Sequence, residues 1–323
     1  MGHFRRPQGG RQLVVMPGTA QKNLLAQAML ADLRQQHPAR PLDVMTPTGL
    51  AGLVSRFVQV DQTLNLPEPN MGWRLYWRAG IEMQGKNYSH AWVLPDRFKP
   101  ALIPALANVP ERTGYRGKYR YSLLIDIRLP RKDLHPHPAD RYRALAWDIG
   151  EPLPAIKPLG MKVDSEAQQE LLEQHQLTLD KPVLAWCPGS LHVLEPARHR
   201  IDPVQQQSFL LQALEQGWQI WLFGSRHEQL EIEHLLSQMD ARLKSQLVNF
   251  VGQLSWEQVV DLLSLAQLQV GQDNPLALLG CACGVSVYLP VQGELPERTQ
   301  GLAPHLGAEW IQLDQLEQKL GEL

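Results

Sequence analysis

Short apolar runs alternate with stretches of helical periodicity in the first half of the chain. Residues 13–16 (LVVM) have the pattern of a buried strand, and from Asn23 onward apolar residues recur at helical spacing. Two further rounds of strand and helix follow, which predicts a parallel sheet with helices on both faces. The expected strands are residues 13–16, 42–45 and 91–94, and the expected helices end near residues 35, 57 and 107.

The same pattern restarts beyond a proline-rich stretch. Residues 151–159 contain three prolines, which is typical of a linker between domains. We therefore expect two doubly wound α/β domains, residues 1–155 and 156–323, that face a central cleft, and we leave open whether the terminal helix returns to the first domain. In the second domain the expected strands are 182–186, 218–223, 247–250, 267–271 and, as the last, 285–289; the expected helices are 203–216, 229–238, 256–265, 275–280 and 313–323.

The composition is that of a globular protein with two cores. The 323 residues are 44% hydrophobic and 20% charged, and the formal net charge of −2 argues against a general nucleic-acid binder. Three cysteines are too few for a disulfide framework, and Cys281 and Cys283 are expected to be buried structural thiols rather than metal ligands. Because no run of about 18 apolar residues is present, we expect a cytoplasmic protein whose membrane contact, if any, is peripheral at the inner face of the inner membrane.

Four turns rich in small and polar residues follow the strands of the second half. Turns of this kind expose backbone N–H groups at helix starts, where a phosphate can be held. With Arg198 nearby they indicate a nucleotide-diphosphate site, although ordinary turn chemistry uses the same residue types. The four turns are residues 187–190 (CPGS), 223–228 (FGSRHE), 251–255 (VGQLS) and 271–275 (GQDNP).

The stretch from Trp92 to Ala146 resembles the lipopolysaccharide heptosyltransferases of glycosyltransferase family 9, and their heptosyltransferase II branch most of all. It contains LPDRFKPAL followed by RTGYRG, similar to that family's LP-x-x-FK-x-AL and RTG-x-RG patterns, and the later turns follow in the family's order. The resemblance implies a GT-B fold, in which two Rossmann-like domains hold the acceptor and the ADP-heptose donor respectively. It also implies an inverting transfer of heptose to the inner core of lipopolysaccharide, with neither metal nor cofactor.

The chain departs from the family at the position of the general base. The family places an aspartate at the start of the first helix, where it accepts the proton of the attacking sugar hydroxyl. Lys22 stands at that position in this chain, and an ammonium group cannot accept a proton. Asp96, just after the strand at 91–94, is the carboxylate that can replace it; the alternative is that Asp96 pairs with Arg97 or Lys99.

A second departure lies at residues 272–278 (QDNPLAL). Asp273 is retained, and the resemblance implies that it holds hydroxyls of the donor sugar. Asn274 stands in place of a hydroxyl residue and is expected to be an N-cap, Pro275 lacks the N–H of the family's glycine, and Leu278 replaces a histidine. The expected donor-binding residues are Gly189, Ser190, Arg198, Gly224, Ser225, Asp273 and Asn274.

Residues 112–132 concentrate positive charge, with seven basic residues and one acidic residue. Gly114 and Gly117 predict a loop in the first part of this stretch, with tyrosines between the arginines. We favour a surface for a phosphorylated acceptor; a solvated basic face, a site for anionic lipid headgroups and an RNA surface are the alternatives. The expected acceptor-binding residues are Lys99, Arg112, Arg116 and Arg120.

Three functions fit these features. The favoured one is a glycosyltransferase of the heptosyltransferase type, whose partners are a nucleotide sugar such as ADP-heptose and a lipopolysaccharide acceptor, without nucleic acid. The second is a GT-B enzyme with a different sugar-nucleotide donor. The third is a catalytically silent relative that binds an acceptor or a partner enzyme. Lys22 and Asp96 bear on whether the chain is active, because catalysis requires a proton acceptor. Asn274, Pro275 and Leu276 bear on which donor it takes.

Overall fold

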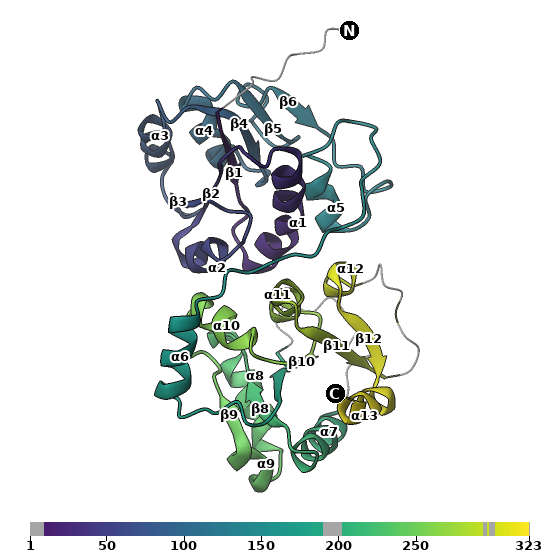
Figure 1. Cartoon of the computed structure of the whole chain (residues 1–323). Coiled ribbons are helices and arrows are strands. Elements are labelled where there is room, and N and C mark those ends of the chain that lie inside the picture. Colours follow the sequence, from purple (N-terminus) through teal and green to yellow (C-terminus); the bar gives the residue numbers. More distant parts are fainter. Residues whose placement is uncertain (1–9, 190–201, 293–295, 297–300, 323) are drawn as a thin grey trace. The chain divides into compact units, whose positions relative to one another are not determined.

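The computed structural model describes residues 10–189, 202–292, 296 and 301–322 (Figure 1). The chain divides into two compact units, residues 1–157 and 158–323. Each unit contains a six-stranded sheet in which all paired strands run parallel. None of the helices in the described part of the chain combines the length and apolar character needed to cross a bilayer.

The first unit has the strand order β3-β2-β1-β4-β5-β6. Its core lies where fully buried strand residues such as Leu13 and Val93 pack against Ile103 of a covering helix. The strands are β1 (Arg11–Val15), β2 (Leu42–Pro47), β3 (Gln62–Leu66), β4 (Tyr88–Val93), β5 (Glu111–Tyr115) and β6 (Asp126–Arg128). The helices are α1 (Ala20–Gln36), η1 (Thr48–Leu50), α2 (Ala51–Ser55), α3 (Trp73–Glu82), α4 (Phe98–Leu106) and α5 (Pro138–Arg143).

The second unit has the strand order β12-β11-β10-β7-β8-β9. Leu184, Trp186, Ile220 and Leu268 of its strands are buried in one cluster. The strands are β7 (Val183–Cys187), β8 (Gln219–Leu222), β9 (Leu247–Asn249), β10 (Leu268–Gly271), β11 (Ser286–Val291) and β12 (Glu309–Gln312). The helices are α6 (Ser165–Gln174), α7 (Pro203–Glu215), η3 (Arg226–Glu228), α8 (Gln229–Ser237), α9 (Ala241–Gln246), α10 (Trp256–Leu263), α11 (Pro275–Cys283), α12 (Ala303–Leu306) and α13 (Leu313–Glu322).

Both sheets have the same topology. Numbered within its own unit, each sheet reads 3-2-1-4-5-6, so the strand order reverses between β1 and β4 and between β7 and β10. Ligands of doubly wound sheets bind at the carboxyl ends of the strands beside such a reversal. The expectation of two doubly wound α/β units is confirmed, and the topology directs attention to the loops after β1, β4, β7 and β10.

Two local predictions were wrong. Residues 285–289 do not form the last strand, because β12 adds a further edge strand after β11. Residues 111–115 form β5, although Gly114 suggested a loop. Gly114 is instead a point of close approach, since a Cβ atom there would lie 2.8 Å from the carbonyl oxygen of Val93.

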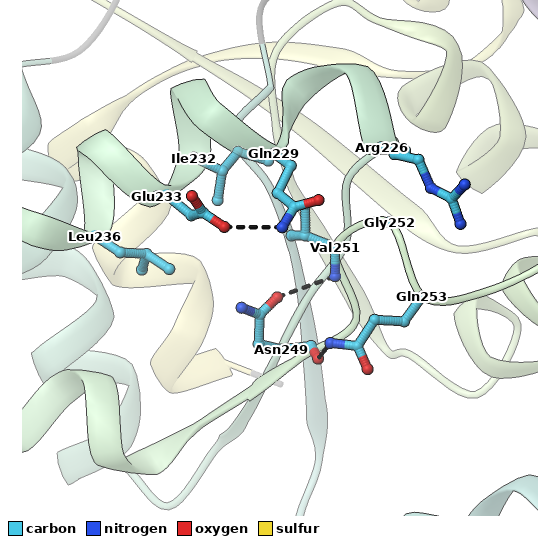
Figure 2. A pocket seen from close by; sticks show the side chains of 9 residues that line it. All are labelled: Arg226, Gln229, Ile232, Glu233, Leu236, Asn249, Val251, Gly252 and Gln253. Atoms are coloured by element: carbon cyan, nitrogen blue, oxygen red, sulfur yellow. Dashed lines mark hydrogen bonds between the residues drawn. The ribbon is translucent and has the colours of Figure 1, made fainter.

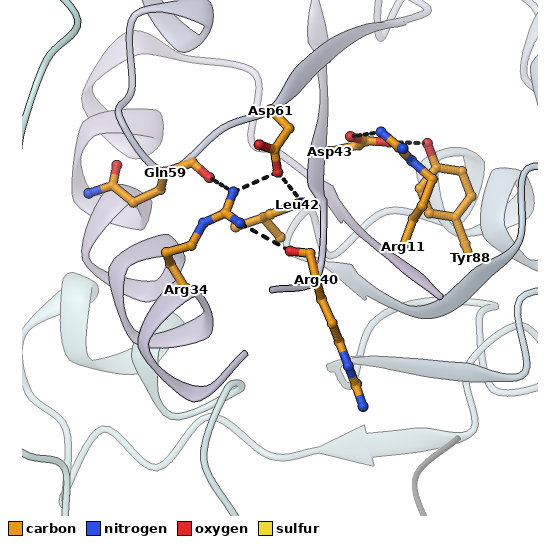
Figure 3. Close-up of polar contacts among 8 residues, drawn as sticks. All are labelled: Arg11, Arg34, Arg40, Leu42, Asp43, Gln59, Asp61 and Tyr88. Atoms are coloured by element: carbon orange, nitrogen blue, oxygen red, sulfur yellow. Dashed lines mark hydrogen bonds and ion pairs between the residues drawn. The ribbon is translucent and has the colours of Figure 1, made fainter. Parts of the chain in front are cut away.

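Polar side chains tie the amino ends of the first sheet together (Figure 3). The guanidinium of Arg11 donates two hydrogen bonds of 2.7 Å to the fully buried carboxylate of Asp43, and the hydroxyl of Tyr88 donates a third, at 2.6 Å. Burial and the hydrogen bond to Asp43 raise the pKa of Tyr88. This cluster lies at the amino ends of β1, β2 and β4, so it stabilises the sheet at the edge opposite the ligand-binding loops.

Candidate functional site

The turn between β1 and α1 is held by a buried amide. Asn23 is fully buried, and its Nδ2 donates hydrogen bonds of 2.7 Å to the carbonyl oxygens of both Pro17 and Thr19. The Thr19 hydroxyl accepts the backbone N–H of Lys22 at 3.4 Å and caps the helix. Lys22, where the sequence resemblance led us to expect a general base, is exposed. The sequence analysis did not identify this role of Asn23. The signal that could have revealed it is a polar residue on the apolar side of a helix.

Asp96 is exposed at the carboxyl end of β4, next to β1 in the sheet. Its backbone position is fixed by a loop that packs directly against it. A Cβ atom on Gly117 would lie 2.1 Å from the carbonyl oxygen of Asp96, and the guanidinium of Arg120 donates to the neighbouring carbonyl of Pro95. Asp96 and the turn that carries Lys22 therefore follow adjacent strands at one edge of the sheet.

Two tyrosines near this edge have perturbed acidities. Burial raises the pKa of Tyr142 to about 12; the positive charge of Arg141 opposes this effect, and the negative charge of Asp96 adds to it. Burial also raises the pKa of Tyr115 to about 12, and its hydroxyl donates to the carbonyl of Arg141. Both phenols are therefore protonated at neutral pH. Neither was singled out in the sequence as part of the site near Asp96.

Several of the expected acceptor-binding residues bind the protein's own main chain. Arg120 is only 1% exposed and donates to the carbonyls of Pro95 and Tyr115, while Arg112 donates to those of Val109 and Leu123. Burial lowers the pKa of both guanidinium groups. Arg120 thus holds the loop beside Asp96, Arg112 joins the segments that precede β5 and β6, and both guanidinium groups are occupied by these main-chain carbonyls.

The other basic residues of 112–132, and Lys99 before them, differ in whether their positive charge is available to a ligand. Arg128 bonds to Asp126 at 2.7 Å, whereas Arg116 is exposed and stacks 5.8 Å from the ring of Tyr121. Lys118 is exposed as well. The ammonium of Lys99 donates to the carbonyl of Met71 at 2.7 Å, so it holds the segment that leads into α3. Only part of the positive charge between Arg112 and Lys132 therefore faces solvent.

In the second unit, Glu228 connects the turns after β7 and β8. Its carboxylate is 5% exposed and accepts both the backbone N–H and the hydroxyl of Ser225, at 2.9 and 2.7 Å. Gly189 packs against the same carboxylate, and Gly224 lies in the turn that it closes. The spacing Ser-x-x-Glu is that of a capping box and was present in the sequence, but was not recognised.

Asn274 confirms the prediction of an N-cap. Its side-chain oxygen accepts the backbone N–H groups of Leu276 and Ala277 at 2.9 and 3.1 Å, and Pro275 occupies the first turn of α11. Its amide donates in turn to the carbonyl of Gly189, at 2.9 Å. Asn274 therefore joins the loop after β7 to the helix after β10, on either side of the strand-order reversal.

Asp273 is also engaged by the protein itself. It is 1% exposed, and its two oxygens accept the backbone N–H groups of Leu302 and Ala303 at 2.6 and 2.8 Å. Burial raises the pKa of this carboxyl, against the opposing effect of the two hydrogen bonds. A role toward sugar hydroxyls stays a prediction. Ser190 and Arg198, also expected to bind the donor, lie outside the described residues.

A pocket of about 430 Å³ opens at the carboxyl ends of β8 and β9 (Figure 2). Ile232 and Val251 line it with apolar groups, and Gln229, Asn249 and Gln253 contribute amides. Some of these amides bond within the wall, since Gln229 donates to Glu233 at 2.8 Å and Gln253 to the carbonyl of Asn249 at 2.9 Å. The pocket follows the same turns that were expected to hold a nucleotide.

Comparison with known proteins agrees with this geometry. The model of glycosyltransferase family 9 (heptosyltransferase) matches residues 76–289. The chain is 31% identical over 292 residues to lipopolysaccharide heptosyltransferase 2 of Salmonella typhimurium, and the match covers 86% of this chain and 82% of that protein. It is 29% identical over 290 residues to lipopolysaccharide heptosyltransferase 2 of Escherichia coli K12, with the same coverage of both chains. A solved structure of ADP-heptose lipopolysaccharide heptosyltransferase II of E. coli, 24% identical, gives a TM-score of 0.81 over 97% of this chain and 98% of that chain.

These matches confirm the resemblance seen in the sequence and the GT-B fold that it implied. The family model spans most of the chain, and the curated relatives match 86% of it. The similarity includes both six-stranded units, and with them the turns after β1 and β4 in the first unit and those after β7 and β10 in the second. The chain therefore belongs to glycosyltransferase family 9, the heptosyltransferases.

Proposed function

We propose that this chain is a glycosyltransferase that moves heptose from a nucleotide sugar, ADP-heptose or a close analogue, to the inner core of lipopolysaccharide. The observation that carries the proposal is its 31% identity, over 86% of the chain, to a lipopolysaccharide heptosyltransferase 2. Fold alone does not decide function. The side chains in the loops at the carboxyl ends of the two sheets are therefore assigned roles one by one.

The donor is assigned to the second unit. The pocket beside β8 and β9 suits a nucleoside, because Leu236 and Val251 offer apolar contact to a planar base and the neighbouring amides offer hydrogen bonds. The diphosphate is assigned to the turns that contain Gly189 and Ser225, with Arg198 as its cation. Backbone N–H groups and an arginine neutralise the charge that develops on the leaving diphosphate, so the reaction is proposed to need no metal.

Asp96 is assigned the role of general base. The acceptor hydroxyl attacks the anomeric carbon from the face opposite the diphosphate, the new C–O bond forms as the bond to the diphosphate breaks, and the hydroxyl proton passes to the Asp96 carboxylate. This displacement inverts the anomeric configuration. Support comes from the exposure of Asp96 at the carboxyl end of β4 and from the tight contact of its backbone with Gly117, which orients the carboxylate.

The acceptor is assigned to the first unit. Arg116 and Lys118, exposed on the loop that packs against Asp96, are proposed to contact phosphate groups of the core oligosaccharide. Arg112 and Arg120 are given a positioning role instead, because their guanidinium groups bind main-chain carbonyls. On this account the acceptor lies beside the base and is held by the exposed charges of one loop.

A second candidate is a relative that binds substrates without turnover. Lys22 favours it, because a lysine stands where the family has its catalytic aspartate. A third is transfer from another sugar nucleotide, favoured by Asn274 and Pro275 at the donor helix. All three share the scaffold, so ligand binding and turnover must be measured separately.

A thermal-shift panel with nucleotide sugars tests the proposal. A ligand at about 100 times its Kd stabilises the native state by about 2.7 kcal/mol, so ADP-heptose should raise the melting temperature clearly. A shift with another nucleotide sugar and none with ADP-heptose would support a different donor. No shift with any nucleotide sugar would contradict the donor assignment, and a shift without turnover would favour the silent relative.

A further inference from the structure

Helix α3 exposes large apolar side chains to solvent. Trp73, Trp77 and Ile81 are 54%, 47% and 43% exposed, and Met71 just before the helix is 41% exposed. A spacing of four residues places the three helical side chains in one row along the helix. The two indole rings meet edge to face with their centroids 6.0 Å apart. We call Met71, Trp73, Trp77 and Ile81 the tryptophan face.

The side of α3 next to the tryptophan face is firmly packed, so the helix cannot simply rotate this face inward. Tyr76 is 1% exposed, and its hydroxyl donates to the carbonyl of Pro67 at 2.6 Å. At Gly80 the helix approaches α4 so closely that a Cβ atom would lie 2.7 Å from that of Leu106. Figure 1 shows α3 beside α4 at the margin of the first unit. The exposure of the tryptophans is therefore a fixed feature of the fold.

Positive charge runs beside the tryptophan face. Arg74 and Arg78 form the next row along α3, and residues 71–81 contain no acidic residue. Arg78 pairs with Glu82 at 2.7 Å, but both side chains are mostly exposed, at 77% and 61%, and such a pair is readily exchanged for another anion. An apolar row edged by arginines is complementary to a surface whose outer layer is anionic and whose interior is apolar.

We propose that the tryptophan face, with Arg74 and Arg78, docks the protein on a bilayer that contains anionic lipids. Tryptophan side chains favour the boundary between headgroups and acyl chains, and arginines beside them pair with lipid phosphates. The face is a row along one helix, which suits shallow insertion parallel to a bilayer. The proposal goes beyond the assigned reaction and does not depend on it, because it concerns lipid headgroups alone.

Co-sedimentation with vesicles tests this docking surface. The full-length protein is mixed with vesicles of phosphatidylethanolamine and phosphatidylglycerol, or of phosphatidylcholine alone, at low and high salt. We expect binding to the anionic vesicles that salt weakens. The Trp73→Ala/Trp77→Ala double variant should lower the partition coefficient roughly 30-fold, from the lost burial of two half-exposed indoles, and Arg74→Gln or Arg78→Gln about fivefold each.

The matched control removes apolar side chains of similar or greater exposure elsewhere. Val204 and Leu230 are 72% and 81% exposed in the second unit, and the Val204→Ala/Leu230→Ala variant should bind vesicles like the wild type. Equal melting temperatures of all variants exclude unfolding as the cause of a loss. Failure of the wild type to bind anionic vesicles, or unchanged binding by the tryptophan variant, would overturn the proposal. A dimer that the tryptophan variant abolishes would overturn it too, because a second copy would then cover the face. The vesicles carry neither sugar nucleotide nor acceptor, so this result is separate from any test of transfer.

Discussion

The side-chain amide of Asn274 donates a hydrogen bond to the main-chain carbonyl of Gly189, 2.9 Å away. The two residues belong to loops that follow β7 and β10, the neighbouring strands at which the second sheet reverses its order. One side chain thus caps α11 and fixes the distance between two loops assigned to the donor. Asn274 therefore has a structural role in the second unit that depends on both ends of its side-chain amide.

Replacing Asn274 should weaken the second unit. Asn274→Ala removes an N-cap and a buried hydrogen bond, which together are expected to lower the free energy of unfolding by about 1–3 kcal/mol. Urea denaturation measures the loss. Asn274→Ser keeps a capping oxygen but cannot reach Gly189, so it should lose less than the alanine variant. Equal stability of the wild type and the alanine variant would show that the bond to Gly189 has no energetic role.

A methyl group at Gly117 should disturb the loop around Asp96. The Cβ atom of Gly117→Ala would lie 2.1 Å from the carbonyl oxygen of Asp96, so the backbone must shift, at a cost of about 1–3 kcal/mol. Transfer activity should fall as well, because the carboxylate moves. Gly49→Ala is the control, since no atom lies within 4 Å of a Cβ there. Normal stability and activity of Gly117→Ala would contradict the close packing of this loop.

The buried pair between Arg143 and Asp32 should contribute more than any exposed pair. Arg143 donates to Asp32 at 2.8 Å, both side chains are 2% exposed, and the indole of Trp147 donates to the same carboxylate at 3.0 Å. Asp32→Asn leaves the buried guanidinium with only Asp140, 3.2 Å away and partly exposed, as a counter-charge, and we expect a loss of about 3 kcal/mol in denaturant unfolding. Glu82→Gln, which breaks the exposed pair with Arg78, should change stability by about 0.5 kcal/mol or less. Similar effects of the two substitutions would contradict this ranking.

Alkaline pH should destabilise the protein through its cysteines. Burial raises the pKa of Cys281 and of Cys283 to about 12, whereas thiols of the unfolded chain ionise near pH 8.5. Because the unfolded state loses these protons first, the free energy of unfolding is unaffected at neutral pH and falls as the pH rises from about 9 toward 12. Denaturant titrations at several pH values measure the fall, which Cys281→Ala/Cys283→Ala should reduce. Rapid reaction of the native thiols with Ellman's reagent at pH 8 would contradict the raised pKa values.

The sequence was sufficient for the alternation of strands and helices and for the N-cap at Asn274, because both depend on residue types close together in the chain. The sequence was insufficient where a side chain's partner lies far away along the chain. Arg112 and Arg120 looked like part of a basic surface, yet their partners are main-chain carbonyls that no local pattern reveals. The short strand β12 pairs only with β11, and four residues carry too little periodicity to predict it. The cysteine prediction was partly right: Cys281 and Cys283 are free but only partly buried.

A substitution at Lys22 tests the proposed alternative of a silent relative. If activity was lost recently through this position, Lys22→Asp should restore turnover to a chain that lacks it. If Asp96 has taken over as base, the same substitution should change a wild-type rate only slightly, because the exposed side chain of Lys22 is outside the proposed proton transfer. Product formation from ADP-heptose, followed over time for both chains, distinguishes these outcomes.

The most direct test compares the turnover of wild type, Asp96→Asn and Arg97→Ala with ADP-heptose and a heptose-deficient lipopolysaccharide acceptor. Removal of a general base lowers the rate by about 100- to 10,000-fold, so Asp96→Asn should lose nearly all activity while Arg97→Ala, at the neighbouring exposed position, loses far less. Equal and mild losses in the two variants, or a wild-type protein that produces no heptosylated product, would contradict the account.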